Sequence, residues 1–399
     1  MMKTAKLLFF VFVILITTSV TYTGIHYVDA NSPNDPGNGT VSDPFRRIQH
    51  GIDAAAPSGD IVQIRPGLYS GPGNRDLNPG GKAVIIRGID PDDPTTVGTV
   101  IIDPNFNGSG FEIISGETSD CIIEGLTIRN ADSGYWGGAV ICESASPTIR
   151  NCIIVNSKGR YGGGIGYYQS DALLLNCTIV NNHCDFSGGG IFIDNSNVTI
   201  RNCIIWQNRL DDPENSNGPQ IALEYHSNAS VSYCNTEDGL LGTSAIESTL
   251  SWLQGNIDNE PKFASFDTDA EPDTWDFRLQ SQFGRWDNNT TQWITEADTS
   301  QCIDAGDPNS NWTEELWPHG GKINIGAYGG TPQASMSASQ LGNIADLDHN
   351  DTVSTSDFAI LAESWLTQRL LLPQDLDRNG WINLADLALF AKNWLWRQQ

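Results

Sequence analysis

The chain has 399 residues, of which 40 are glycine and only 18% are charged, and its formal net charge is −26. A glycine-rich composition with few charged residues is typical of a turn-rich β protein and not of a helical one. The negative charge argues against a nucleic-acid partner, because a duplex is bound by a basic surface. It also argues against a polyanionic sugar, unless a cation or a local basic patch mediates the contact.

The first 24 residues have the features of a secretory signal peptide. Lys3 and Lys6 precede an unbroken apolar run from Leu7 to Ile16, and a small polar stretch follows. The run is too short to span a bilayer comfortably, although an uncleaved anchor is an alternative. We expect residues 1–24 to be removed and the mature protein to be secreted, extracellular or associated with the cell surface. No later segment is apolar enough to predict a membrane span.

Residues 25–103 are expected to start the folded part of the chain. The segment FRRIQHGIDAA, residues 45–55, has apolar side chains three and four positions apart, which is the spacing of an amphipathic helix. Asp43 can cap this helix, and Pro44 suits its first position. Such a helix would cover the open end of a stack of strands. The stretches IVQIRPGLY and KAVIIRGID follow as strands that end in turns.

A repeat of about 25 residues occupies the middle of the chain, from about residue 120 to residue 238. Asn-Cys, an apolar run and a glycine-rich corner recur, so that Cys152, Cys177 and Cys203 are spaced by 25 and 26 residues. A fixed period of this length, built of short strands without helices, is the signature of a β-solenoid. From residue 241 to residue 300 the period fades, and we interpret this part as irregular coils or loops packed on the solenoid.

The eight cysteines fall into two groups. Four occupy the repeated position, where we expect them to stack inward as small buried side chains: Cys152, Cys177, Cys203 and Cys234. The other four fit this column less well: Cys121, Cys142, Cys184 and Cys302. Exported proteins commonly carry disulfides, so the disulfide status of this second group stays open.

Several motifs resemble those of a known superfamily. YVDAN at Tyr27, the 45–55 segment and GDIVQIRPGLY resemble the opening of secreted right-handed parallel β-helix proteins of the pectin-lyase-like superfamily. CIDAGDP and INIGAYGG, in the region before residue 331, look like its C-terminal closing segment. The resemblance implies an all-β right-handed parallel β-helix over residues 25–330. Lyases that resemble this fold use a cationic side chain as the base, with calcium held on carboxylates.

Aligning the coils on the cysteine column defines further columns, because consecutive parallel coils lie about 4.8 Å apart. One is an amide column that we interpret as structural: Asn130, Asn156, Asn181 and Gln207. A second is basic in three successive coils: Lys158, His183 and Arg209. A third lies on the strand after the glycine-rich corner and is expected to face outward: Glu143, Tyr168, Asp194 and Glu224.

The outward column could carry acid–base chemistry. Asp194 and Glu224 would be close enough to raise the pKa of one carboxyl group, which makes them our candidate catalytic pair. Tyr168 could stack on a sugar ring, so we assign Tyr168, Glu143 and the basic column to substrate binding, the basic column for a uronate or a developing enolate. The alternative is that these side chains are simply solvated on the outside of the solenoid. No catalytic signature accompanies either column.

Residues 331–342, TPQASMSASQLG, are small and polar and predict a linker. The chain then changes character, and residues 343–399 contain two similar segments that begin 29 residues apart, at Asp346 and Asp375. Each starts with a twelve-residue loop and continues into an apolar pattern with helical spacing. We therefore expect a small separate helical domain over residues 343–399.

The two loops have the ligand spacing of a calcium site. Oxygen-bearing side chains fall at positions 1, 3, 5, 9 and 12, and position 7 offers a backbone carbonyl. The predicted ligands are Asp346, Asp348, Asn350, Thr352, Ser354 and Asp357 in the first loop and Asp375, Asp377, Asn379, Trp381, Asn383 and Asp386 in the second. Gly380 occupies position 6 of the second loop, where Asp351 stands in the first. We predict two Ca²⁺ ions in this domain.

This duplicated pattern resembles a type I dockerin over residues 343–397. The resemblance implies binding to a cohesin-like module on a scaffold or surface protein, usually on behalf of a polysaccharide-degrading enzyme. In that family positions 10 and 11 of each loop help to choose the partner, which points to Thr355, Ser356, Leu384 and Ala385. The pairs differ between the two loops, so a symmetric dual binding mode is put in doubt.

Three functions are compatible with this organisation. The first is a secreted polysaccharide-active enzyme, a lyase or a glycoside hydrolase, attached through a calcium-dependent dockerin. The second is a non-catalytic, carbohydrate-binding or adhesive solenoid, and the third is a structural cell-surface protein that the calcium domain anchors. We expect a monomer in each case, apart from the attachment partner.

Overall fold

The computed structural model describes residues 24–88, 90, 94–96, 98–212, 217–270, 272–339 and 341–398. The predicted signal peptide lies outside the described residues except for Gly24. In the part of the chain that is described, no helix combines the length and the apolar character needed to cross a membrane.

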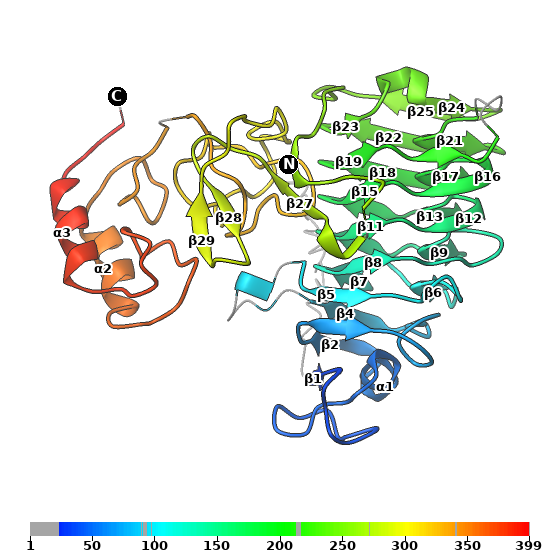
Figure 1. Ribbon diagram of the computed structural model, residues 1–399, viewed down its shortest axis with the longest axis horizontal. Coiled ribbons are helices and arrows are strands. Elements are labelled where there is room, and N and C mark those ends of the chain that lie inside the picture. Colours follow the sequence, from blue (N-terminus) through cyan, green and yellow to red (C-terminus); the bar gives the residue numbers. More distant parts are fainter. Residues whose placement is uncertain are drawn as a thin grey trace, which may run out of the picture.

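Parallel strands form a solenoid from β1 to β25 (Figure 1). The first sheet consists of β1 (Ile25–Val28), β2 (Ser58–Ile64), β4 (Ala83–Arg87), β7 (Ile122–Glu124), β10 (Thr148–Arg150), β14 (Leu173–Leu175), β18 (Asn197–Arg201), β22 (Asn228–Ser232) and β25 (Thr249–Trp252). The second consists of β3 (Gly67–Tyr69), β5 (Val100–Ile102), β8 (Thr127–Arg129), β11 (Ile153–Val155), β15 (Thr178–Val180), β19 (Ile204–Trp206) and β23 (Asn235–Thr236).

Two further sheets complete each coil. The third sheet consists of β6 (Phe111–Ile113), β9 (Val140–Glu143), β13 (Ile165–Tyr168), β17 (Ile191–Asp194), β21 (Ile221–Glu224) and β24 (Thr243–Ala245). A short corner sheet lies between the second and third sheets and consists of β12 (Lys158–Tyr161), β16 (His183–Ser187) and β20 (Arg209–Leu210). The predicted all-β solenoid is therefore confirmed.

The core follows from the alternation of side chains along each strand. In the first sheet Ile149 pairs in register with Ile123 and Leu174, and all three are fully buried. Because equivalent residues of successive coils point the same way, each apolar column becomes a continuous stack inside the solenoid. Such stacking removes apolar surface from water along the whole length of the coil, which is what holds the short strands together.

Helix α1 (Ile48–Ala54) covers the first coil, as predicted, and buries Ile48 and Ile52. The predicted cap is wrong, because the helix begins after Arg47 and no side chain at that position caps it. Asn74, from the following coil, accepts a hydrogen bond from the Ile48 amide at 2.9 Å instead. The helix therefore begins three residues beyond the segment's first apolar residue, and a non-local side chain satisfies its free N–H group.

The amide column lies at a sharp corner of each coil. Asn130, Asn156, Asn181 and Gln207 all have positive φ, between 50° and 54°. Asparagine tolerates this left-handed backbone better than most residues. The side-chain amide of Asn156 donates to Asn130 at 2.7 Å, so the column also links successive coils. The structural interpretation of this column is confirmed.

All eight cysteines are buried, and none forms a disulfide. The predicted column is present, with the backbone amide of Cys177 only 3.4 Å from the Cys203 sulfur. The second group is buried elsewhere in the fold. Burial raises the pKa of Cys121, Cys184 and Cys302 to about 12. These thiols are therefore protonated and sheltered, which makes them poor nucleophiles.

We expect the eight thiols to be unreactive in the folded protein, because each is buried and thiol reagents attack the exposed thiolate. Titration with DTNB should detect no fast-reacting thiol before unfolding and eight in denaturant. A count of six in denaturant without reductant would reveal a disulfide and contradict this result.

The chain after the solenoid folds back along its side. Two antiparallel hairpins, β26 (Phe263–Ser265) with β27 (Asp276–Leu279) and β28 (Arg285–Asp287) with β29 (Gln292–Ile294), lie beside the coils (Figure 1). An apolar cluster joins Phe263, Phe277 and Ile325 to the outer face of the second sheet, at Ile153 and Ile204. The expected closing segment thus packs against the side of the solenoid and does not cap its end.

The expected linker is not a linker over residues 331–337. Gln333 is fully buried, and its side chain accepts a hydrogen bond from the buried guanidinium of Arg278 at 2.9 Å. Met336 is buried with Trp286, Leu316 and Leu371. Small polar residues predict an exposed connection, but here their backbone and side chains fill the space between the hairpins and the C-terminal domain.

The C-terminal domain contains α2 (Thr355–Glu363) and α3 (Leu384–Lys392), each preceded by one acidic loop. Each loop forms a backbone hydrogen bond with the segment that follows the helix of the other half. Val353 pairs with Leu395 at 3.1 Å, and Ile382 pairs with Leu366 at 3.0 Å. The two pairs are related by the 29-residue offset, so the duplicated sequence folds into two similar halves around a small apolar core.

Candidate functional site

The outward column is formed in the third sheet. Glu143, Tyr168, Asp194 and Glu224 end strands β9, β13, β17 and β21 and pair in register along the sheet. The structure thus brings all four together, with Asp194 directly beside Glu224. Glu143 is exposed, and Tyr168 and Glu224 are half-buried.

Asp194 is an unusual surface carboxylate, because only 6% of the residue is exposed. The structure shows no hydrogen bond from the described residues to its carboxyl oxygens, but these oxygens are not among the buried polar atoms that lack a partner, so they still reach solvent. Burial, and then the charge of Glu224, raise the pKa of Asp194 above its ordinary value. Desolvation beside a second carboxylate disfavours the charged state, so Asp194 holds its proton more readily than a solvated aspartate.

An aromatic ladder flanks the carboxylates. We use this name for Trp136, Tyr161 and Phe186, whose rings stack in successive coils with centroid distances of 4.9 Å and 5.3 Å. Phe192, the outward neighbour of Asp194 on β17, is buried beneath the ladder, 5.1 Å from the Tyr161 ring. Arg160 lies beside Phe186 with its guanidinium 4.8 Å from the ring centroid.

The sequence reasoning missed this ladder, although a signal was present. Trp136, Tyr161 and Phe186 are each 25 residues apart, which is the period of the repeat. The alignment did not include this column, although Tyr161 and Phe186 lie on β12 and β16 of the corner sheet. An aromatic residue that recurs with the coil period predicts a stack, because equivalent positions are neighbours in space.

A cavity of about 470 Å³ lies where the ladder meets the carboxylate column. Its lining residues come from successive coils: Tyr161, Phe186, Ser187, Asn217, Glu224, Tyr225, Ile246 and Glu247. Burial, and then the charge of Glu224, raise the pKa of Tyr161, and both residues line the cavity. The cavity therefore joins aromatic rings to a carboxylate, and the neighbour of that carboxylate is Asp194.

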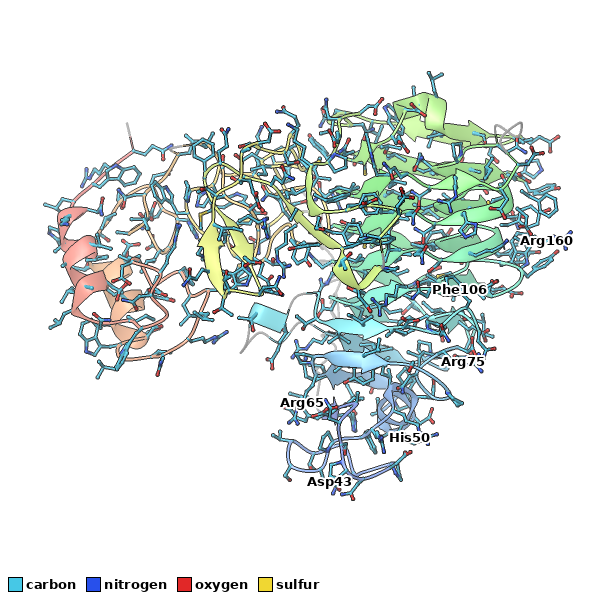
Figure 2. All side chains as sticks on the ribbon, in the orientation of Figure 1. Asp43, His50, Arg65, Arg75, Phe106 and Arg160 are labelled. Carbon is cyan, nitrogen blue, oxygen red and sulfur yellow. The ribbon has the colours of Figure 1, made fainter. Side chains whose placement is uncertain are left out.

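This cavity faces away from the C-terminal domain. Strands β12 and β16 of the corner sheet lie at the edge of the solenoid opposite α2 and α3 (Figure 1). Arg160, beside the ladder, projects from the same outer edge (Figure 2). A partner bound to the C-terminal helices would leave this edge accessible.

The predicted basic column is present but is already paired. Lys158, His183 and Arg209 align in the corner sheet. The side chain of Asp211 lies 3.0 Å from the Lys158 ammonium and 2.8 Å from Nδ1 of His183. Arg209 donates to the side chain of Asn181 at 2.8 Å. Asp211 thus engages both Lys158 and His183, and the assignment of the basic column to substrate binding stays a prediction.

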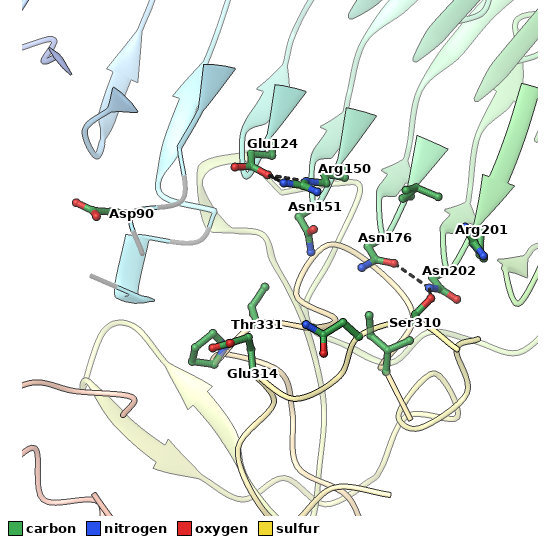
Figure 3. Close-up of a pocket in the computed structure, with 15 residues that line it drawn as sticks. Asp90, Glu124, Arg150, Asn151, Asn176, Arg201, Asn202, Ser310, Glu314 and Thr331 are labelled. Carbon is green, nitrogen blue, oxygen red and sulfur yellow. Dashed lines mark hydrogen bonds and ion pairs between the residues drawn. The ribbon is translucent and has the colours of Figure 1, made fainter. Parts of the chain in front are cut away.

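A second cleft, of about 520 Å³, lies between the first sheet and the C-terminal segment (Figure 3). Its charged groups are largely engaged. Arg150 donates to Glu124 at 2.6 Å, and Arg201 donates to Asp307 at 2.9 Å. Asn151 also donates to the Ala327 carbonyl at 3.0 Å. We interpret this cleft as the seam that holds the C-terminal segment on the solenoid, and not as the reactive site.

The two acidic loops each gather three carboxylates. In the first loop one oxygen from each of Asp346, Asp348 and Asp357 lies within 4.8 Å of the others, and the second loop repeats this with Asp375, Asp377 and Asp386. Burial raises the pKa of Asp375 to about 6, and the charge of Asp386 adds to this. Each loop thus concentrates negative charge that a divalent cation would neutralise, and hard oxygen ligands fit Ca²⁺.

The remaining predicted ligands lie around the same loops. Asp351 and Gly380 at position 6 have φ of 65° and 81°, the left-handed turn that the loop requires. The side-chain oxygens of Asn350 and Asn379 accept hydrogen bonds from the backbone amides two residues further on, at 3.0 Å and 2.8 Å. Ser354 and Asn383 at position 9 cap helices α2 and α3. Thr352 and Trp381 bridge to Arg397 and Gln368 of the opposite half.

Both loops contact the preceding segment through their fourth residue. His349 approaches the Thr313 carbonyl at 3.2 Å, and Arg378 donates to the Trp317 carbonyl. The Arg378 guanidinium also lies 5.6 Å from the Trp293 ring centroid. The four predicted partner-binding residues lie in the first turns of α2 and α3, and all are exposed: Thr355, Ser356, Leu384 and Ala385.

Comparison with known proteins supports the fold. A family model described as a right handed beta helix region matches residues 95–259. No curated protein sequence gives a significant match. One solved structure, "Crystal structure of pectate lyase Pel9A", is 14% identical with a TM-score of 0.32, covering 77% of this chain and 96% of that one. The solenoid is thus a right-handed parallel β-helix, and a TM-score this low says nothing about its activity.

Proposed function

We propose that this chain is a secreted polysaccharide-active enzyme whose reactive groups are Asp194 and Glu224. The observation that carries the proposal is the largely buried Asp194 side chain next to Glu224, at an aromatic-lined cavity. Carbohydrate sites commonly combine aromatic rings, which pack on the apolar face of a sugar, with carboxyl groups that exchange protons.

The environments of the two carboxyl groups suggest different roles. Asp194, with its raised pKa, is suited to donate a proton to the leaving oxygen of a glycosidic bond. Glu224 lines the cavity and is suited to act as the base or the nucleophile. A lyase would need a cationic base; of the three residues in the basic column, Lys158 and His183 are paired with Asp211, and Arg209 donates to Asn181. Between elimination by a lyase and hydrolysis by a glycoside hydrolase, we therefore favour hydrolysis.

A panel of polysaccharides tests this proposal. We expect new reducing ends to appear for at least one substrate, without the absorbance of unsaturated products, because hydrolysis adds water across the bond. Unsaturated products would show that the reaction is an elimination. Binding without any turnover across the panel would favour the alternative, a non-catalytic adhesive or structural cell-surface solenoid.

We further propose that the C-terminal domain holds two Ca²⁺ ions and attaches the chain to a cohesin-like scaffold or surface protein. The support is the pair of carboxylate clusters at equivalent positions of the two halves. The ligands would be the twelve residues predicted from the loop spacing. The exposed residues at positions 10 and 11 would contact the partner, and they lie on the opposite edge of the molecule from the cavity.

A further inference from the structure

We propose that the cavity accepts uncharged sugar residues and rejects uronates, so that the substrate is a neutral polysaccharide. This inference rests on the proposed function and narrows it. Two carboxylates, Glu224 and Glu247, line the cavity, and the described lining residues include no lysine, arginine or histidine. A uronate carboxylate placed there would meet like charge and find no cation to pair with.

The surroundings of the cavity strengthen this charge argument. Asp194 and Glu143 extend the carboxylate column beside Glu224. Of the basic side chains around the cavity, Lys158 and His183 are held by Asp211. His226 follows the lining residue Tyr225 but does not itself line the cavity. Arg160 lies against the rings of Phe186 and Tyr135, 4.8 Å and 5.7 Å from their centroids. Arg160 is exposed but does not line the cavity.

The apolar part of the lining fits the faces of sugar rings. Phe186, Tyr225 and Ile246 are 39%, 59% and 47% exposed, although each is a large hydrophobic side chain. Pyranose and furanose rings carry C–H groups on their faces, which pack on aromatic surfaces, while their hydroxyl groups donate to carboxylates. Glu224 and Glu247 can accept such hydrogen bonds, and neither interaction needs a charge on the ligand.

Binding to neutral and to anionic glycans tests the proposal. The full chain carrying Asp194→Asn, which removes the proposed acid, is titrated with a soluble β-glucan, a mannan and polygalacturonate. We expect at least one neutral glycan to bind at least tenfold more tightly than polygalacturonate. Phe186→Ala and Tyr225→Asn should each weaken that binding about tenfold, whereas Phe283→Ala, which removes an exposed ring outside the cavity, should not. Asparagine is chosen to replace Tyr225 because the backbone φ at this position is 52°, a left-handed conformation that asparagine tolerates.

Two results would overturn the inference. One is polygalacturonate binding as tight as that of the neutral glycans, abolished by Arg160→Ala. The other is the absence of binding to both neutral glycans by protein whose far-ultraviolet spectrum is native. Failure of the proposed function looks different: neutral glycans would bind in the cavity, but wild-type protein would cleave none of them. Conversely, cleavage of polygalacturonate that depends on Asp194 would preserve the enzyme and refute the neutral substrate.

Discussion

Removal of calcium is expected to unfold the C-terminal domain while the β-helix stays folded. Among the described residues of the domain, six buried apolar side chains form its core: Ala345, Val353, Leu361, Leu376, Ile382 and Phe390. Domains of this size rarely bury enough surface to be stable alone, and metal binding then supplies folding free energy. The three clustered carboxylates of each loop repel one another, so loss of the ion removes an attraction and leaves a repulsion.

Circular dichroism and melting with and without chelator measure this effect. At a free calcium concentration about 1,000 times the dissociation constant, one site would stabilise the folded domain by about 4 kcal/mol. We expect the Asp346→Ala, Asp375→Ala double variant to resemble the chelated protein. Glu363→Gln, an exposed change on α2 outside both loops, should respond to calcium as the wild type does.

The same samples can be passed over an immobilised cohesin module. Retention in calcium and release by chelator would support the proposed partner, while calcium-dependent folding without retention would separate the metal site from the choice of partner. A melting transition of the domain that is unchanged by chelator would refute the two-ion proposal.

The sequence predicted the register of the solenoid because periodicity is a local property of the chain. Once Cys152, Cys177 and Cys203 define the period, every residue at a fixed offset from them has a predictable neighbour. Asp194 and Glu224 could therefore be paired from sequence, although an insertion lengthens the coil between them to 30 residues. The aromatic ladder was equally accessible, and only the choice of columns left it out.

The differences from the sequence-based expectations have a common physical cause. Aligning the coils identifies only neighbours at equivalent positions, and it cannot identify a contact from a residue at a different position in the repeat. Asp211 directly follows strand β20, and its side chain pairs with Lys158 and His183 on the two preceding strands of the corner sheet. Asn74 replaces the predicted cap of α1 from 26 residues away. Gln333 is buried only because Arg278, on a hairpin, approaches it. Composition describes residues 331–342 correctly as small and polar, but it does not say what packs against them.

Asp194→Asn is expected to reduce turnover by about 10²–10⁴-fold, the usual contribution of a general acid. The amide has nearly the same shape but carries no transferable proton. Because the pKa of Asp194 is raised, the wild-type acid should stay protonated to a higher pH than an ordinary aspartate, which extends activity on the alkaline side. Reducing-end release against pH measures both effects, with Glu260→Gln, an exposed carboxylate outside the cavity, as the matched control.

The same substitution should leave the protein as stable or more stable, which distinguishes a catalytic residue from a structural one. A carboxyl group whose pKa is raised by folding favours the folded state only at low pH. That contribution is lost as the pH rises through the raised value, because burial and the charge of Glu224 disfavour the carboxylate in the folded protein. Asp194→Asn should therefore melt at or above the wild-type temperature near neutral pH, and the difference should vanish in acid. A large fall in both turnover and melting temperature would instead show that Asp194 supports the fold, and full activity in Asp194→Asn would remove it from the mechanism.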